Sequence, residues 1–147
     1  MKIFLFIIFL IFPLFGSAHT VELDDKTAEE IINSRMKIMS NVNNLVKKIY
    51  KQLNTSDFDL LEKKTLELKH SAKEFKKLFP ENSKGGKAKN SIWDDKILFD
   101  EYNDNFIDDI NLMLIDIDDK NIISLKENFN KMSSNCGACH KKFKNKK

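Results

Sequence analysis

Cysteine and proline are scarce in this sequence, which has only two of each. Both cysteines lie near the C-terminus, and the histidines at positions 19 and 70 are far from them along the chain. A structural zinc site needs four ligands, so without a second cysteine pair it is disfavoured. No stretch shows the alternation of polar and apolar residues that marks a half-buried strand. These absences favour an all-α chain.

The two cysteines belong to the segment Cys136-Gly137-Ala138-Cys139-His140. This spacing is typical of c-type haem attachment, in which both thiols form thioethers and the histidine binds the iron. In a helix, Cys136, Cys139 and His140 share one face, because they stand at i, i+3 and i+4. We therefore predict one haem c per chain, held by Cys136 and Cys139, with His140 as an iron ligand.

Two other interpretations of the cysteine pair remain open. A thioredoxin-like dithiol usually lies at a helix N-terminus after a strand, where the helix dipole lowers a thiol pKa. Here the pair lies near the end of a segment with helical periodicity, and no strand pattern precedes it. A structural disulfide is the other alternative.

The N-terminal residues 1–18 have the pattern of a secretory signal peptide. Lys2 is followed by an apolar run from Ile3 to Phe15 and then by the small residues of positions 16–18. The alternative is an uncleaved anchor, but the run is shorter than the ~20 residues of a spanning helix. Export also suits thiols that await haem, because the cytosol is reducing. We predict a periplasmic mature chain of residues 19–147, with no membrane segment.

The charge balance argues against a nucleic-acid-binding protein, since the formal net charge is only +3. Lysines nevertheless gather at positions 141, 142, 144, 146 and 147, beside the haem motif. They are either solvated cations that suit a helix C-terminus or a docking patch for an acidic redox partner.

Apolar residues recur every three or four positions in four segments, each about 25 residues long. We predict helices from about Thr27 to Leu53, from Ser56 to the residue before Pro80, from Ser91 to about Ile117, and from Ile122 to Phe143. The long connection, 81–90, is expected to be a solvated loop. Four such helices predict an antiparallel up-down-up-down four-helix bundle.

Arg35 is the only arginine among 25 basic residues, and it lies on the apolar stripe of the first predicted helix. A charged group on a core stripe must be paired, and a haem propionate would supply the anion. The alternative is that Arg35 extends to solvent at the edge of the stripe. Met39, one turn further on, lies on the same predicted stripe as Ile32 and Val46.

These residues together resemble the class II cytochromes c, the cytochrome c prime family. The resemblance covers essentially the whole mature chain, and it rests on Arg35-x-x-x-Met39, Leu78-Phe79-Pro80, Ile92-Trp93 and Cys136-x-x-Cys139-His140-x-x-Phe143. It implies a haem between the helices, with His140 as the proximal ligand, Arg35 near a propionate and Met39 on the distal side. Pairing of two chains into a homodimer, as in relatives, is also possible.

The resemblance implies two functions. Members whose methionine is the sixth ligand look low-spin and suited to electron transfer, and our first prediction is such a carrier, with His140 and Met39 on the iron, redox proteins as partners and no enzymatic activity. Members with an open iron bind small gases such as nitric oxide or carbon monoxide, and Met39 would then be core filler. One departure from the family is Lys144, where arginine is common.

Overall fold

A computed structural model describes residues 26–146, so the predicted signal peptide lies outside the described residues. The helices are α1 (Ala28–Gln52), α2 (Phe58–Lys77), α3 (Ser91–Asp94), α4 (Lys96–Asp118) and α5 (Ile122–Phe143), with a 3-10 turn, η1 (Glu81–Ser83). No strand occurs within this described part, apart from one isolated bridge. The four long helices form the predicted all-α, antiparallel four-helix bundle.

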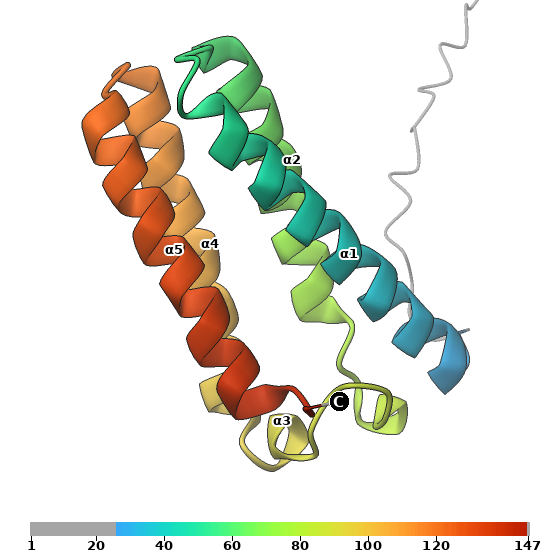
Figure 1. Ribbon diagram of the computed structural model, residues 1–147. Coiled ribbons are helices and arrows are strands. Elements are labelled where there is room, and N and C mark those ends of the chain that lie inside the picture. The colour runs from blue at the N-terminus through green and yellow to red at the C-terminus, as the bar shows by residue number, and fades with distance from the viewer. Residues whose placement is uncertain (1–25, 147) are drawn as a thin grey trace, which may run out of the picture.

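The long helices pack in the order of the chain, α1 against α2, α2 against α4, and α4 against α5. The turns between α1 and α2 and between α4 and α5 lie at one end of the bundle (Figure 1). The crossover segment 81–90, α3 and the C-terminus lie at the other end, which we call the loop end. In this view α1 and α5 diverge towards the loop end.

Local capping explains where the first two helices begin. The Thr27 side chain accepts a hydrogen bond from the Glu30 backbone, and the Glu30 carboxylate accepts one from the Thr27 backbone, which makes a capping box. The prediction that Ser56 caps α2 is wrong. Ser56 has a φ of 54°, and Asp57 is the cap, because its carboxylate accepts a hydrogen bond from Leu60 N at 3.0 Å.

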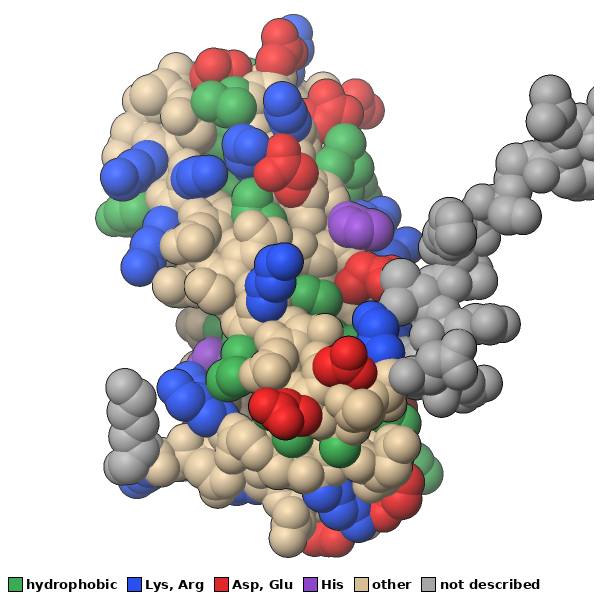
Figure 2. Space-filling model, turned by 90° about the vertical axis from the view of Figure 1, so that its right-hand side faces the viewer, with side chains coloured by type: hydrophobic (Ala, Val, Ile, Leu, Met, Phe, Trp, Pro, Cys, Tyr) green, Lys and Arg blue, Asp and Glu red, His purple; other side chains and the backbone are tan. Residues whose placement is uncertain are grey.

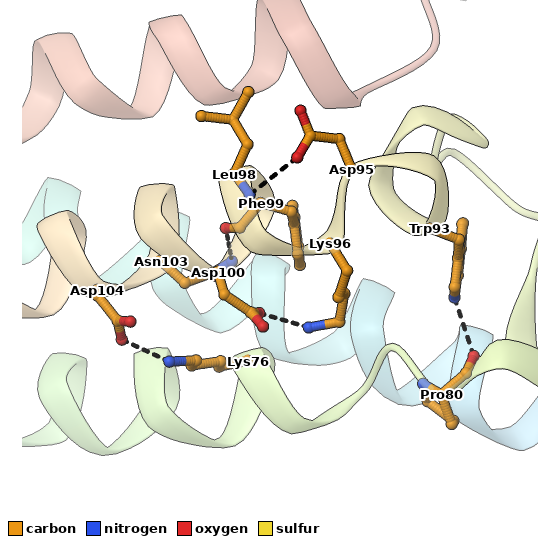
Figure 3. A network of polar contacts seen from close by, with 10 residues as sticks. All are labelled: Lys76, Pro80, Trp93, Asp95, Lys96, Leu98, Phe99, Asp100, Asn103 and Asp104. Carbon is orange, nitrogen blue, oxygen red and sulfur yellow. Dashed lines mark hydrogen bonds and ion pairs between the residues drawn. The ribbon is translucent and has the colours of Figure 1, made fainter.

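The third predicted helix is interrupted at Asp95. This residue has an extended φ of −134°, and its carboxylate caps α4 by accepting from Leu98 N at 3.2 Å (Figure 3). The short α3 that precedes it presents Trp93, whose Nε1 donates to the Pro80 carbonyl at 3.0 Å. The break therefore lets the chain turn at the loop end and join the crossover segment to α4.

Two apolar clusters fill the bundle. The central core takes residues from all four long helices: Val42, Leu45, Ile49, Leu53, Leu61, Leu68, Ala72, Ile110, Met113, Ile117, Leu125, Phe129 and Met132. The loop-end core consists of Ile31, Leu78, Phe79, Ile92, Phe99 and Phe143. Its rings make edge contacts, with centroids 4.5 Å apart for Phe79 and Phe99 and 5.2 Å apart for Phe99 and Phe143.

The buried stripe of α1 agrees only in part with the predicted one. Ile31, Arg35, Val42, Leu45 and Ile49 are buried, whereas Ile32, Met39 and Val46 are only partly buried. Apolar residues occupy two adjacent stripes of this helix, so either could have faced the core. In the bundle, the side of α1 that contains Arg35 faces inward. Met39 lies nearer the edge of the buried face.

The surface shown in Figure 2 mixes acidic and basic side chains, with small apolar areas between them. Among the described residues, no helix has the length and apolar character needed to cross a bilayer.

Candidate haem site

The haem-attachment motif lies in the last two turns of α5, as predicted. Cys136 and Cys139 are free and only partly buried, although the apolar periodicity of α5 places both of them in line with its core residues. Cys139 packs against the loop-end core. In this helical segment Cys136, Cys139 and His140 share one side, which is the arrangement that one porphyrin requires.

The thiols are not activated nucleophiles. Burial raises the pKa of Cys136, and the negative charge of Asp109 raises it further. Burial also raises the pKa of Cys139 to about 11. A dithiol catalyst needs a lowered thiol pKa, so these two cysteines do not fit that alternative. Zinc does not fit either, since residues 26–146 contain no group of three or more metal-ligating His, Cys, Asp or Glu side chains.

The surroundings of His140 favour the neutral form of its imidazole, which is the form that binds iron. Although much of its side chain is exposed, burial of the remainder lowers the pKa of His140, and the nearby Lys144 lowers it further. A neutral imidazole has the free lone pair that a metal needs. His140 also lines a cleft of about 420 Å³, together with Lys87, Lys141, Lys144, Asn145 and Lys146. Neither cysteine lines this cleft.

Arg35 is 6% exposed, so the alternative that it extends to solvent is wrong. One amino group donates to the Ser83 carbonyl, and the guanidinium carbon lies 4.8 Å from the Phe79 ring centroid and 5.5 Å from that of Trp93. The other amino group, Nη1, is buried and has no hydrogen-bond partner among the described residues.

The unpaired Nη1 of Arg35 shows whether this site suits a haem, because a haem propionate would give it an acceptor. None of the ion pairs among residues 26–146 involves Arg35. A buried guanidinium without an anion is unfavourable, and burial lowers the pKa of Arg35 for that reason. Arg35 and Cys139 both contact the loop-end core, so an acid-bearing group attached at the cysteines fits the unused donor.

Met39 lies one turn beyond Arg35 on α1 and packs against the central core. It is partly buried, while Met36 is 47% exposed, and Met132 and Met113 are fully buried in the central core. His70 is exposed on α2, as expected of a surface residue.

The crossover segment 81–90 is more than the solvated connection that we predicted. Ser83 is fully buried, and the Lys89 backbone donates to the Phe143 carbonyl at 3.0 Å. Asn145 N donates to the Lys87 carbonyl at 2.9 Å, and Ala88 forms a bridge with Lys144. Through Ser83 and Arg35 this segment also contacts α1. It therefore connects α1 to the residues that follow His140.

Two buried carboxylates on α4, Asp109 and Asp116, were not identified from the sequence. The signal was present, because they lie seven residues apart next to the apolar residues of α4. Helix α4 has many other acidic residues that face solvent, and the sequence alone does not distinguish the two buried ones from them.

Comparisons with known proteins identify the family of this chain. The family model described as Cytochrome C′ matches residues 30–144. A solved cytochrome c′ is 19% identical, with a TM-score of 0.77, and the match covers 82% of this chain and 98% of that one.

Structures of cytochrome c prime from Alcaligenes xylosoxidans are also similar. A ferrous variant with bound NO is 21% identical with a TM-score of 0.78, and the recombinant native protein is 20% identical with a TM-score of 0.77. Each match covers 82% of this chain and 98% of the other. Curated protein sequences give no match.

The two cysteines and the histidine that are expected to hold a haem c lie together in α5. The family model extends over most of the chain, including this motif and Arg35. The chain therefore belongs to the cytochrome c′ family, which implies a covalently bound haem c.

Proposed function

We propose that this protein binds a small gas such as nitric oxide at a haem c iron that is ligated by His140 on one side only. The packing of Met39 is the observation that favours this function. The function predicted first was an electron carrier in which both His140 and Met39 ligate the iron. Met39 contacts the central core, and as a ligand it would have to give up part of that packing. The nitric oxide complex of the similar Alcaligenes xylosoxidans protein supports the same choice.

Several side chains of this protein would hold the haem, each in a different way. Cys136 and Cys139 would carry the covalent links, and their raised pKa values keep both thiols protonated before attachment. Neutral His140 would ligate the iron, and Arg35 would donate Nη1 to a propionate. When bound, the haem would supply an iron that can bind a diatomic gas.

The setting proposed for this activity follows from the sequence. Residues 1–18 would direct export, and the mature chain would work in the periplasm with one haem. Its partners would be redox proteins that reduce the iron, and gas binding as such requires no catalytic turnover. A homodimer remains a further proposal.

Absorption spectra of the purified holoprotein, in the ferric and ferrous forms and with carbon monoxide, test the proposal. A high-spin ferric spectrum and immediate binding of carbon monoxide by the ferrous protein are expected. A low-spin ferric spectrum with no carbon monoxide binding would instead favour Met39 ligation. The control is Met39→Leu, which removes the sulfur but keeps an apolar side chain of similar size. It should leave the spectra of a five-coordinate protein unchanged and convert a low-spin protein to high-spin.

A further inference from the structure

The boundary between α4 and α5 contains two buried carboxylates that haem attachment does not use. Asp109 is 3% exposed and Asp116 is 8% exposed. Each accepts a hydrogen bond from an asparagine amide of α5, Asp109 from Asn135 at 2.5 Å and Asp116 from Asn128 at 2.6 Å. The two carboxylates are therefore buried but paired.

The two pairs have matching spacing on the two helices, which favours the observed alignment of α4 and α5. Asp109 and Asp116 are seven residues apart on α4, and their partners Asn135 and Asn128 are seven residues apart in the reverse direction on α5. Sliding α5 along α4 by one turn would separate both carboxylates from their asparagine amides. Buried polar pairs of this kind set the register between helices.

The Asp109–Asn135 pair lies beside the turn of α5 that contains the haem-attachment motif. Its partner Asn135 directly precedes Cys136, and its other oxygen lies 3.0 Å from the amino group of Lys131. The charge of Asp109 also acts on the thiol: after burial, it contributes to the raised pKa of Cys136. Lys131 is 60% exposed, whereas the carboxylate is buried, and of these two charges only that of Asp109 is among the causes of the raised pKa of Cys136.

We propose that Asp109 is a positioning residue of the haem site, which fixes the register of the Cys136 turn against α4 and keeps a negative charge beside it. A fixed negative charge near a haem stabilises the ferric over the ferrous state. Asp109 therefore lowers the midpoint potential of the attached haem. This inference rests on haem attachment at Cys136, which belongs to the function proposed above.

The holoprotein test compares Asp109→Asn with Asp116→Asn, the same substitution about 10 Å further along α4. Both variants should unfold at lower urea concentration than the unmodified protein. Only Asp109→Asn should also raise the midpoint potential. Equal potentials in the two variants and the unmodified protein would overturn the electrostatic role.

A reciprocal exchange, Asp109→Asn with Asn135→Asp, separates register from charge. It keeps an Asp–Asn pair between the helices and keeps the negative charge next to Cys136. We expect it to recover most of the stability lost in Asp109→Asn and to retain the low potential. This double variant also tests the proposal should Asp109→Asn fail to fold. Failure of the exchange to recover stability would overturn the register role.

The apoprotein provides a readout that does not depend on haem. At fixed pH, alkylation of Cys136 by iodoacetamide should be several-fold faster in Asp109→Asn than in the unmodified apoprotein, while Cys139 changes little. Peptide mapping distinguishes the two thiols. Equal acceleration at both would indicate general loosening and would contradict the specific role of Asp109. A selective effect in a chain that fails to attach haem would show that Asp109 acts on Cys136, while it would contradict the proposed function and with it the effect of Asp109 on a haem.

Discussion

At the scale of single residues, Arg35 and His140 show how burial prepares a site for its cofactor. Arg35 is buried with one amino group engaged by Ser83 and the other left without a partner among the described residues. His140 is kept neutral by partial burial and by a nearby lysine. Each residue is in an unfavourable or incomplete state in the chain alone, and a haem would complete it.

Replacing Arg35 with leucine should lower the midpoint potential of the holoprotein. A guanidinium beside a propionate favours the ferrous state, and losing one charge in a partly buried site shifts a one-electron couple by tens of millivolts. Potentiometric titration measures the shift. Arg35→Lys, which keeps the charge but not the planar fork, should retain most of the potential. If Arg35→Leu had the potential of the unmodified protein, Arg35 would not act on the haem.

Lys144 is predicted to influence the titration of His140 in the apoprotein. The pKa of His140 is lowered from 6.5, first by burial and second by Lys144. Lys144→Gln should therefore raise it, but not to 6.5, because burial remains. Histidine chemical shifts followed by NMR as a function of pH measure the change. Lys146→Gln is the control, since Lys146 is not among the causes of the shift.

The sign of the stability effect follows from the direction of this shift. A folded-state pKa below the unfolded value means that the fold favours neutral His140. This contribution to stability is present above about pH 6.5 and is lost as the pH falls through the lower folded value. Urea unfolding of the apoprotein should therefore show a decrease in stability over this range, and the decrease should be smaller in Lys144→Gln.

At the scale of the elements, the crossover segment 81–90 shapes the site more than its composition suggests. It places the Ser83 carbonyl against Arg35 and pairs with the chain that follows His140. Gly86 makes this close approach possible. It has a φ of +63°, and a Cβ there would lie 2.9 Å from Cγ2 of Ile32.

Gly86→Ala should destabilise the protein by roughly 1–3 kcal/mol, because it combines a left-handed backbone with a contact that Ile32 must yield to. The matched control is Gly137→Ala in α5, where a Cβ would meet nothing within 4 Å. That change should be neutral or stabilise the helix by up to about 1 kcal/mol. Urea unfolding of both variants measures the difference. Equal stabilities would mean that the crossover segment moves freely away from α1.

At the scale of the whole molecule, the two ends of the bundle differ in how complete they are without a cofactor. The central core extends through all four long helices with continuous apolar packing. The loop end contains the partly buried cysteines and the unpaired Nη1 of Arg35. A haem attached at the cysteines would add contacts at that end.

A chain with Cys136→Ser and Cys139→Ser, which cannot form thioethers, should show this difference in hydrogen exchange. Amides around the turns from α1 to α2 and from α4 to α5 should keep the protection that they have in the holoprotein. Amides in the first turns of α1 and the last turns of α5 should lose much of theirs, because the local free energy of opening falls. Uniform loss along all four helices would contradict an independent central core.

Much of the fold follows from local signals in the sequence. The four long helices and their antiparallel order were predicted from apolar periodicity and turn residues, and the limits of α1 and α5 agree with the structure to within about two residues. The haem motif depends on a five-residue pattern that needs no tertiary information. The first residue of a helix was harder to predict where two neighbouring residues could each be the N-cap, as Ser56 and Asp57 could be for α2.

The sequence by itself determined the helices, the bundle and the Cys136–His140 motif, because each depends on residues close together in the chain. Tertiary structure alone decided that Arg35 faces inward, that Met39 packs at the edge of the central core, and that Asp109 pairs with Asn135. The physical reason is that α1 carries two adjacent apolar stripes and α4 many acidic residues. Only packing against neighbouring helices selects which of them are buried.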